Sequence, residues 1–332
     1  MNVLIPNIGR RGYLVKYIKE IENFRGKVYV SDCDTTASGL YGNNDGYFIL
    51  PKPVDNEKKY VDSLLNLCRK NDIGIIIPVI DPEIYILSKY VNLFKEEDIL
   101  LMVSNEKVLD ICYNKLHMND FLKKNNFLVP KTYENINDFM VAKENYEIDF
   151  PVIIKPIYGS GSASTYIVNC IEKMKALFQN GMLIQELIDG QEYGIDVFND
   201  MHNKPVRCVV KKKISMRSGE TDKAISVKNK DIQNNAIRLA ECLKHFGNLD
   251  CDMIMRDNNI YIIDLNPRFG GGYPATHATG TNLLKMTLDI AYGNEIEQKF
   301  DDYKESVLVM KEVSIVSREV SIDEKSGNYS CS

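Results

Sequence analysis

The first hundred residues alternate short apolar runs with amphipathic segments, and this alternation restricts the fold more than any other feature of the sequence. The pattern predicts strands at residues 3–5, 27–31, 74–78 and 100–103, with helices up to residue 22 and over residues 60–71 and 81–93. Strands separated by helices favour a parallel sheet that is covered on both faces. Ligands of such sheets bind at the carboxyl ends of the strands. Here those ends lie near residues 9–12, 32 and 81–83.

Beyond residue 104 the pattern changes to a mixture of helices and hairpins. Residues 105–126 are mostly helical, and short strands are expected at 151–156, 166–169 and 182–185, with a helix over 171–178. From residue 192 the expected strands are 193–198, 206–211, 252–255 and 260–265, with a helix over 231–244. The turn at residues 256–259 predicts that the last two strands form a hairpin. This second part is therefore expected to be α+β.

Composition excludes several classes of function. The 332 residues carry a net charge of −5, which gives no electrostatic reason to bind nucleic acid or an anionic membrane. No apolar run approaches the length of a membrane span, and residues 1–6 do not resemble a signal peptide. The eight cysteines form no C-x-x-C pair, which favours reduced thiols in the cytoplasm. The four histidines are scattered, so a metal would be held by oxygen ligands, which favours Mg²⁺ or Mn²⁺.

The segment from Asp264 to Arg268 is the strongest chemical signal in the chain. Asp264 and Asn266 are two residues apart on a predicted strand, so their side chains share a face, and Asp252 on the partner strand can face them. Two carboxylates and an amide oxygen suit Mg²⁺ that also binds nucleotide phosphates. Arg268 can bind phosphate oxygens with two N–H groups. The alternative is a solvated strand end, but D-x-N-P-R after an apolar strand favours the functional interpretation.

Lys155 and the loop after it form a second candidate. Lys155 ends an apolar strand, and residues 158–164 read Tyr-Gly-Ser-Gly-Ser-Ala-Ser. Small residues allow backbone N–H groups to approach phosphates, so we interpret Ser160, Gly161 and Ser162 as phosphate-binding. The alternatives are a lysine that extends to solvent from a sheet edge and an ordinary turn.

The segment from Gln185 to Glu192 forms a third candidate. Its extended backbone, including Glu186 and Ile188, can bind the edge of adenine, and Glu192 can accept the ribose hydroxyls. Taken by itself, the segment is also consistent with a connecting strand and turn, in which Gly190 adopts a left-handed conformation.

Candidates for substrate binding are more scattered. Residues 211–220 are expected to be a loop between the strand after Glu192 and the helix from residue 231, and Arg217 in it could bind a carboxylate. Gly271 permits close backbone approach just past the predicted metal strand. His277 could orient an acid or an amine, or could simply pack. Arg10 in the first loop and Glu83 after the third strand complete this group.

These pieces occur in the order found in ATP-grasp enzymes, and residues 1–295 resemble single-unit proteins similar to the synthetase half of carbamoyl-phosphate synthase. The resemblance implies an amino-terminal substrate-binding (pre-ATP-grasp) domain at 1–104, a small ATP-grasp subdomain at 105–188 and a large one at 189–332. It implies nucleotide contacts from Lys115 and Lys155 and a phosphate loop at Ser160–Ser164. It also implies adenine contacts from Glu186 and Ile188, ribose contacts from Glu192, metal binding by Asp252, Asp264 and Asn266, and phosphate binding by Arg268. The family most often has Glu at the position of Asp264.

The expected activity is that of an ATP- and Mg²⁺-dependent carboxylate–amine ligase. A carboxylate would attack the γ-phosphate of ATP to give an acyl phosphate, and an amine or ammonia would then displace phosphate. Lys155 and Arg268 would neutralise charge on the transferring phosphoryl group. The expected partners are small molecules, and a homodimer is left open. Two alternatives are a subunit that phosphorylates bicarbonate or carbamate and an ATP-binding regulatory module without catalysis. A dehydrogenase is disfavoured because residues 7–12 are not G-x-G-x-x-G.

Overall fold

The computed structural model describes residues 1–159, 164–317, 320–323 and 328–331. The chain divides into two compact units. The first unit comprises residues 1–105, 282–296 and 311–332, and the second comprises residues 106–281 and 297–310. The domain boundaries at residues 104 and 188 stay predictions.

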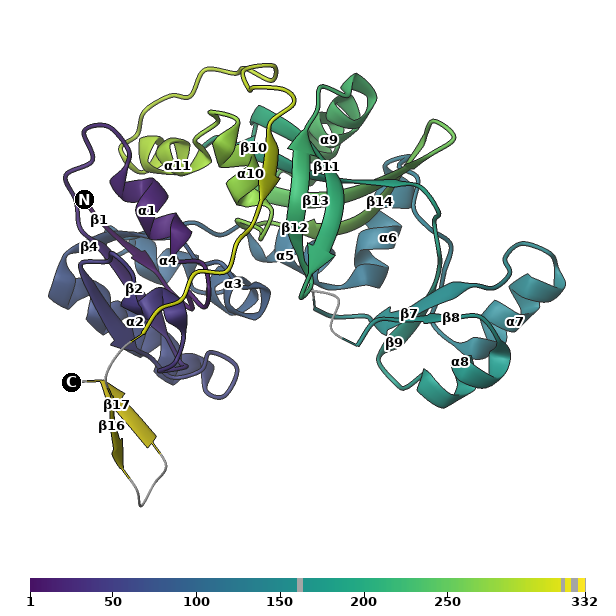
Figure 1. Cartoon of the computed structure of the whole chain (residues 1–332), viewed down its shortest axis with the longest axis horizontal. Coiled ribbons are helices and arrows are strands. Elements are labelled where there is room, and N and C mark those ends of the chain that lie inside the picture. The colour runs from purple at the N-terminus through teal and green to yellow at the C-terminus, as the bar shows by residue number, and fades with distance from the viewer. Residues whose placement is uncertain (160–163, 318–319, 324–327, 332) are drawn as a thin grey trace. The chain divides into compact units, whose positions relative to one another are not determined.

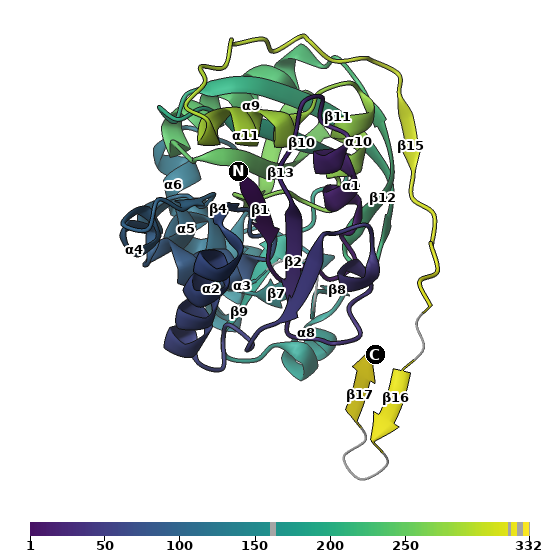
Figure 2. The same cartoon turned by 90° about the vertical axis from the view of Figure 1, so that its left-hand side faces the viewer.

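The first unit contains a five-stranded sheet in the order β3-β2-β1-β4-β5. All of its pairings are parallel, as the alternation of strands and helices predicts. The strands are β1 (Asn2–Ile5), β2 (Val28–Asp32), β3 (Gly46–Ile49), β4 (Ile73–Ile76) and β5 (Leu100–Leu101). Every residue of β2 is buried, which is expected of a strand covered on both faces. Figure 2 shows β1, β2 and β4 with the helices around them.

Helices connect these strands. The helices of the unit are α1 (Tyr13–Lys19), the 3₁₀ helix η1 (Ser38–Tyr41), α2 (Glu57–Asn71), α3 (Asp81–Ser88), α4 (Val91–Lys95) and α11 (Leu283–Ala291). The connection from β1 to β2 and the connection from β3 to β4 run in opposite directions along the sheet, so right-handed crossovers place α1 and α2 on opposite faces. The side chain of Asn56 caps α2 by accepting a hydrogen bond from the Lys59 N–H. The single helix expected at 81–93 is instead α3 followed by α4.

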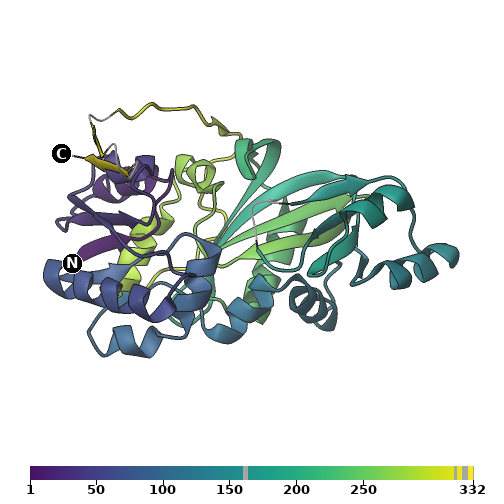
Figure 3. The same ribbon diagram turned by 90° about the horizontal axis from the view of Figure 1, so that it is seen from below.

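The second unit is built on a six-stranded antiparallel sheet in the order β14-β13-β10-β11-β12-β15. Its strands are β10 (Gln191–Asn199), β11 (Pro205–Arg217), β12 (Glu220–Ser226), β13 (Gly247–Arg256), β14 (Asn259–Asn266) and β15 (Leu308–Met310). Side chains alternate between its faces. Buried Ile195, Val197 and Cys251 lie on one face with the apolar side of α9 (Lys230–Leu243), whereas the other face carries charged residues. The long strands are visible in Figures 1 and 3. The hairpin expected at residues 256–259 joins β13 to β14.

The prediction of a loop at residues 211–220 is wrong. These residues form the end of β11 and the start of β12, which pair directly from Lys211 with Ser226 to Arg217 with Glu220. The turn is the dipeptide Ser218–Gly219, and both residues have positive φ, of 50° and 76°. That geometry is typical of a two-residue hairpin, which is why the strand continues through the lysine-rich segment.

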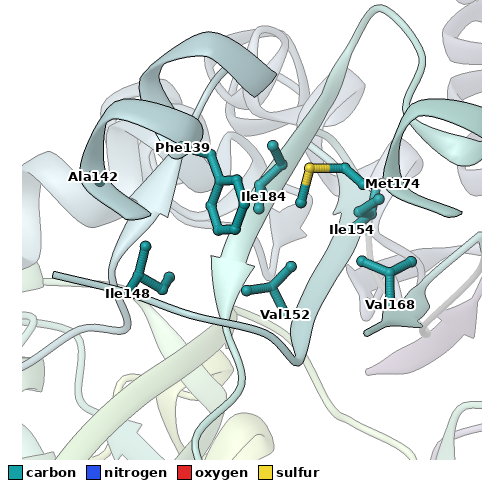
Figure 4. Close-up of a cluster of buried hydrophobic side chains, with 8 residues drawn as sticks. All are labelled: Phe139, Ala142, Ile148, Val152, Ile154, Val168, Met174 and Ile184. Atoms are coloured by element: carbon teal, nitrogen blue, oxygen red, sulfur yellow. The ribbon is translucent and has the colours of Figure 1, made fainter. Parts of the chain in front are cut away.

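The second unit also holds a smaller antiparallel sheet in the order β6-β9-β7-β8. Its strands are β6 (Thr132–Tyr133), β7 (Val152–Pro156), β8 (Tyr166–Val168) and β9 (Met182–Glu186), and helices α7 (Ile136–Glu144) and α8 (Ile171–Leu177) pack on it. Phe139 of α7, Met174 of α8 and Ile184 of β9 meet in its core (Figure 4). This core holds β7, and therefore Lys155, in a fixed frame.

The remaining helices of the second unit are α5 (Glu106–Tyr113), α6 (Lys115–Lys124) and α10 (Tyr273–Ala278). Two short strands, β16 (Val320–Asp323) and β17 (Asn328–Cys331), pair near the carboxyl terminus. Within the part of the chain that the structure describes, no helix has the length and hydropathy needed to cross a membrane. The predicted combination of an α/β unit and an α+β unit is confirmed.

Candidate active site

The predicted metal ligands lie together on the charged face of the six-stranded sheet. Asp252 on β13 is paired with Asp264 on β14, and Asp250 is paired with Asn266. A β-bulge follows Asp252, and the Asn266 amide nitrogen lies 3.3 Å from the Asp264 carboxylate. The hairpin therefore places two carboxylates and one amide side by side, as the spacing of the sequence predicts.

This donor set suits a hard divalent cation. Among the described residues, no group of three His, Cys, Asp or Glu side chains is placed to hold a metal, so the candidate ligands are two acids and an amide. Desolvation raises the pKa of Asp252, Lys213 opposes this rise, and nearby Asp250 and Glu192 add to it, so that the pKa is about 7. The carboxylate is thus short of positive charge, which fits the binding of Mg²⁺ by oxygen ligands.

Lys213 on β11 is the nearest cation to this cluster. Its ammonium lies 2.7 Å from Asp252 Oδ1 and 2.7 Å from Glu192 Oε1, and only 5% of its side chain is exposed. Burial alone would lower the pKa of Lys213, but Asp252 and Glu192 raise it above its ordinary value, so the amine stays charged. The predicted ribose residue and a predicted metal ligand are therefore joined by one lysine that the sequence analysis did not assign.

Lys155 approaches the same cluster, and Lys115 lies near Lys155. Lys155 on β7 is 8% exposed, and burial lowers its pKa to about 8 although Asp264 acts in the opposite direction. Lys115 begins α6, and its ammonium donates a hydrogen bond to the Gly159 carbonyl oxygen. Both lysines are within electrostatic reach of each other. The predicted loop residues Ser160, Gly161 and Ser162 lie outside the described residues.

The predicted adenine segment runs from the end of β9 to the start of β10. The Gln185 side chain is 2% exposed and donates to Thr132 Oγ1 at 3.0 Å, so this side chain stabilises the small sheet. The Glu186 N–H donates to the Lys131 carbonyl, and the Lys131 N–H donates to Glu186 Oε2 at 3.2 Å. The Ile188 side chain is buried, so this residue can offer only its backbone. Glu192 keeps 39% of its side chain exposed, as a ribose ligand requires.

Arg268 is held in position by an ion pair with Asp250. Its guanidinium lies 3.2 Å from Asp250 Oδ2, and its carbonyl accepts a hydrogen bond from the Asn248 amide. Burial and Asp196 raise the pKa of Asp250, and Arg268 counters this rise. Gly270 must lack a side chain, because a Cβ there would lie 1.9 Å from the Asp250 carboxylate. The arginine is thus fixed beside the predicted metal ligands before any phosphate binds.

A second buried network of hydrogen bonds is connected to Arg268 through Asn248. The Asp196 carboxylate accepts hydrogen bonds from Lys211, Thr276 and Asn248 and is fully buried. It ties α10 to the sheet through Thr276. Sequence reasoning missed Lys211 and Lys213, but the Ser218–Gly219 dipeptide is a hairpin signal that could have placed both lysines on one strand face.

The predicted substrate residues divide between the two units. Arg217 forms an ion pair with Asp222 across the β11–β12 hairpin. Gly271 faces Glu220, whose side chain leaves no room for a Cβ. His277 packs against Tyr273, with 5.9 Å between ring centroids, which is the packing interpretation. Arg10, which is exposed, and Glu83 belong to the first unit.

Glu83 is fully buried. Tyr60 donates a hydrogen bond to its Oε1, and burial raises the pKa of Glu83 to about 7 although Tyr60 and Asn7 act to lower it. Glu83 and the nearby Asp32 therefore lie at the carboxyl edge of the parallel sheet, where the fold predicts a ligand.

Comparison with known families agrees with this geometry. Residues 112–272 match the family described as ATP-grasp domain, and residues 3–102 match the family described as PylC-like, N-terminal domain. The chain carries an ATP-grasp domain. Lys155 of the smaller sheet and Asp252 and Asp264 of the six-stranded sheet all lie inside the matched segment.

Relatives of the ATP-grasp chain have low sequence identity. The arginine-specific carbamoyl phosphate synthase large chain of Geobacillus stearothermophilus is 24% identical over 196 residues, which is 55% of this chain and 19% of the relative. The chain therefore spans about a fifth of that relative's length.

Two solved structures share the fold. One is the biotin carboxylase domain dimer of Hydrogenobacter thermophilus 2-oxoglutarate carboxylase with MgADP and bicarbonate, with a TM-score of 0.71, 16% identity, and coverage of 92% of this chain and 73% of that one. The other is an L-amino acid ligase from Bacillus licheniformis, with a TM-score of 0.67, 17% identity, and coverage of 87% and 74%. The shared fold therefore covers about nine-tenths of this chain.

Proposed function

We propose that this chain is an ATP- and Mg²⁺-dependent carboxylate–amine ligase that releases ADP and phosphate. The observation that carries the proposal is the charged face where Asp252, Asp264 and Asn266 lie together, with Lys155 within electrostatic reach of both acids. The hairpin that supplies the ligands also leads directly to Arg268. Such an arrangement suits the neutralisation of a transferring phosphoryl group.

The proposed reaction has two steps. A carboxylate oxygen attacks the γ-phosphorus of ATP, the bond to ADP breaks, and an acyl phosphate forms. The nitrogen of an amine then attacks the acyl carbon, phosphate leaves, and the nitrogen loses a proton. Mg²⁺, when bound, supplies positive charge to the phosphates. Lys155 and Arg268 align and neutralise the phosphoryl oxygens, and Glu192 positions the ribose.

The acid is proposed to bind beside the β11–β12 hairpin. Arg217 pairs with Asp222 there, and Gly271 and Glu220 lie close together nearby. An arginine that exchanges its partner for an incoming carboxylate would use two parallel N–H donors. The fold relative named L-amino acid ligase supports an amino acid as one substrate class.

A phosphate-release assay tests the proposal. Purified chain, ATP and Mg²⁺ are incubated with a matrix of acids, including amino acids, uronic acids, hydroxy acids and bicarbonate, against amines and ammonia. We expect at least one acid–amine pair to stimulate release in the wild type and not in Asp264→Asn. If no pair raises release above background, the ligase proposal fails and a regulatory ATP-binding module takes its place.

Phosphorylation of bicarbonate or carbamate is the second candidate. It is favoured by the similarity to a carbamoyl phosphate synthase chain over 55% of this chain. The bicarbonate and ammonia row of the same matrix separates the two candidates, because the second requires stimulation by that pair alone.

We also propose that the ligase works in the cytoplasm as a homodimer. The described cysteines are free thiols, which is consistent with a reducing compartment. The similar biotin carboxylase structure is described as a domain dimer. Light scattering coupled to size-exclusion chromatography tests the dimer, and a mass of 37.9 kDa in solution would contradict it.

A further inference from the structure

Lys213 occupies a position that a bound metal would have to share. Its ammonium lies 2.7 Å from Asp252 Oδ1, a proposed metal ligand, and 2.7 Å from Glu192 Oε1, the proposed ribose ligand. A divalent cation on Asp252 would therefore lie next to a buried positive charge. Two like charges at such short range repel strongly where solvent is excluded.

The sheet is built to let Lys213 reach Asp252. Lys213 is on β11 and Asp252 is on β13, so the lysine side chain must cross β10, which runs between them. The residue of β10 that pairs with Asp252 is Gly194. A Cβ on Gly194 would lie 3.2 Å from Lys213 Cε and 3.7 Å from Asp252 Oδ1. The missing side chain gives Lys213 its path over the strand.

The neighbouring lysines show that this placement is specific. Lys211, two residues earlier on the same face, forms an ion pair with the fully buried Asp196. Lys212 points to the opposite face and is exposed. Of the three consecutive lysines, Lys213 contacts residues proposed to bind both the nucleotide and the metal.

We propose that Lys213 couples metal binding to nucleotide binding. In the free protein its ammonium takes the place of the metal between Glu192 and Asp252, which makes the site a poor ligand for a divalent cation alone. When the nucleotide enters, its phosphates provide a new anionic partner for Lys213. Asp252 then becomes available to the metal. This inference rests on the proposed function, because it assumes that Asp252 and Glu192 serve ATP and its metal.

The proposal predicts opposite effects of one substitution. Removing the charge in Lys213→Met should tighten the binding of Mn²⁺ alone by about tenfold or more, because Asp252 loses its competing cation. It should weaken the binding of ATP in the presence of a chelator by about tenfold, because the phosphates lose a cation. By linkage, the cooperativity between metal and nucleotide must fall in the variant.

Binding measurements without turnover test this. Free Mn²⁺ is titrated by electron paramagnetic resonance, and chelator-treated ATP by calorimetry, against wild type, Lys213→Met, Lys213→Arg and Lys212→Met. Lys213→Arg retains the charge, and Lys212→Met removes one from the opposite face, so both should resemble the wild type. Circular dichroism verifies folding, and Lys213→Gln replaces the Met variant if that variant unfolds.

Two results would overturn the proposal: Mn²⁺ affinity in Lys213→Met equal to or weaker than in the wild type, or an equal gain in Lys212→Met. Either result, obtained while wild-type phosphate release still depends on an acid and an amine, rejects the coupling role and leaves the ligase proposal standing. Absence of acid- and amine-dependent release in the wild type rejects the ligase proposal by itself.

Discussion

Each unit contains a carboxylate whose pKa lies near 7, Glu83 in the first and the partly exposed Asp252 in the second, but the partners of the two acids differ. Glu83 is fully buried, and its hydrogen-bond partners are the neutral groups of Tyr60 and Asn7. Asp252 lies among other acids and beside Lys213. A buried acid whose hydrogen-bond partners are neutral can be relieved by a proton, whereas a crowded group of acids calls for cations. The difference indicates a protonation site in one unit and a cation site in the other.

The largest expected effect is on the cation site. Asp264→Asn keeps the shape of the side chain and removes its charge, and we expect ATP turnover to fall by about 10³-fold, by analogy with the loss of one preorganised electrostatic contact. Asp257→Asn, in the exposed turn of the same hairpin, is the matched control. Phosphate release measures both. Retention of more than a tenth of the activity in Asp264→Asn would remove this residue from the metal site.

Lys155 should have the next largest effect. Lys155→Met is expected to lower kcat/KM for ATP by about 10²-fold, again by analogy with a lost electrostatic contact. Because the pKa of Lys155 is lowered to about 8, its positive charge is lost as the pH rises through 8, so wild-type kcat/KM for ATP should fall above that pH. Steady-state kinetics from pH 6 to about pH 9.5 measures this, with Lys173→Met on α8 as the control. A value of kcat/KM for ATP that stays constant above pH 8 would contradict the proposed role of Lys155.

The raised pKa of Glu83 leads to a prediction about the stability of the protein. The folded pKa of Glu83 is about 7, above the ordinary value of 4.5, so the native state binds more protons between these values. The free energy of unfolding should therefore fall as the pH rises from 4.5 to 7, by at most about 3 kcal/mol. Glu83→Gln should abolish this slope, and exposed Glu22→Gln should not. Denaturant unfolding at pH 5, 6, 7 and 8 measures it, and an unchanged slope in Glu83→Gln would refute the comparison.

The smallest effect is expected at the rim of the charged face. Arg217 is half exposed in its pair with Asp222, so its loss should hardly change stability. Arg217→Ala should raise the KM of the acid substrate by about tenfold, the loss expected for a charge-assisted hydrogen bond, and leave the KM of ATP unchanged. Lys223→Ala on β12 is the control. Equal changes in both KM values would place Arg217 outside the acid site.

Sequence patterns predicted the parts of the site that depend on local periodicity. Asp264 and Asn266 share a face because a strand repeats every two residues, and the 256–259 turn brings Asp252 opposite them. The end of the apolar run at Lys155 likewise marked the end of β7. These features need no information about distant contacts.

The missed features depend on pairing between distant segments. Lys213 sits in a run of lysines that resembles a solvated loop, and only the pairing of β11 with β12 and β10 turns it into the buried neighbour of Asp252. The short strand β3 carries an alternating, half-exposed pattern over four residues, which is too weak to separate from a turn without its partner β2. Composition alone could not have revealed either.

The order in which the chain visits the two units has a consequence for biosynthesis. The first unit needs residues 282–296, whose helix α11 contacts α1, and the second unit needs residues 297–310, which supply the edge strand β15. A ribosome therefore finishes neither unit before it has made residues 282–310. The first unit, which contains the parallel sheet, stays incomplete while residues 106–281 are synthesised. Both units are consequently completed at almost the same time, and a truncation near residue 281 should leave both without an essential element.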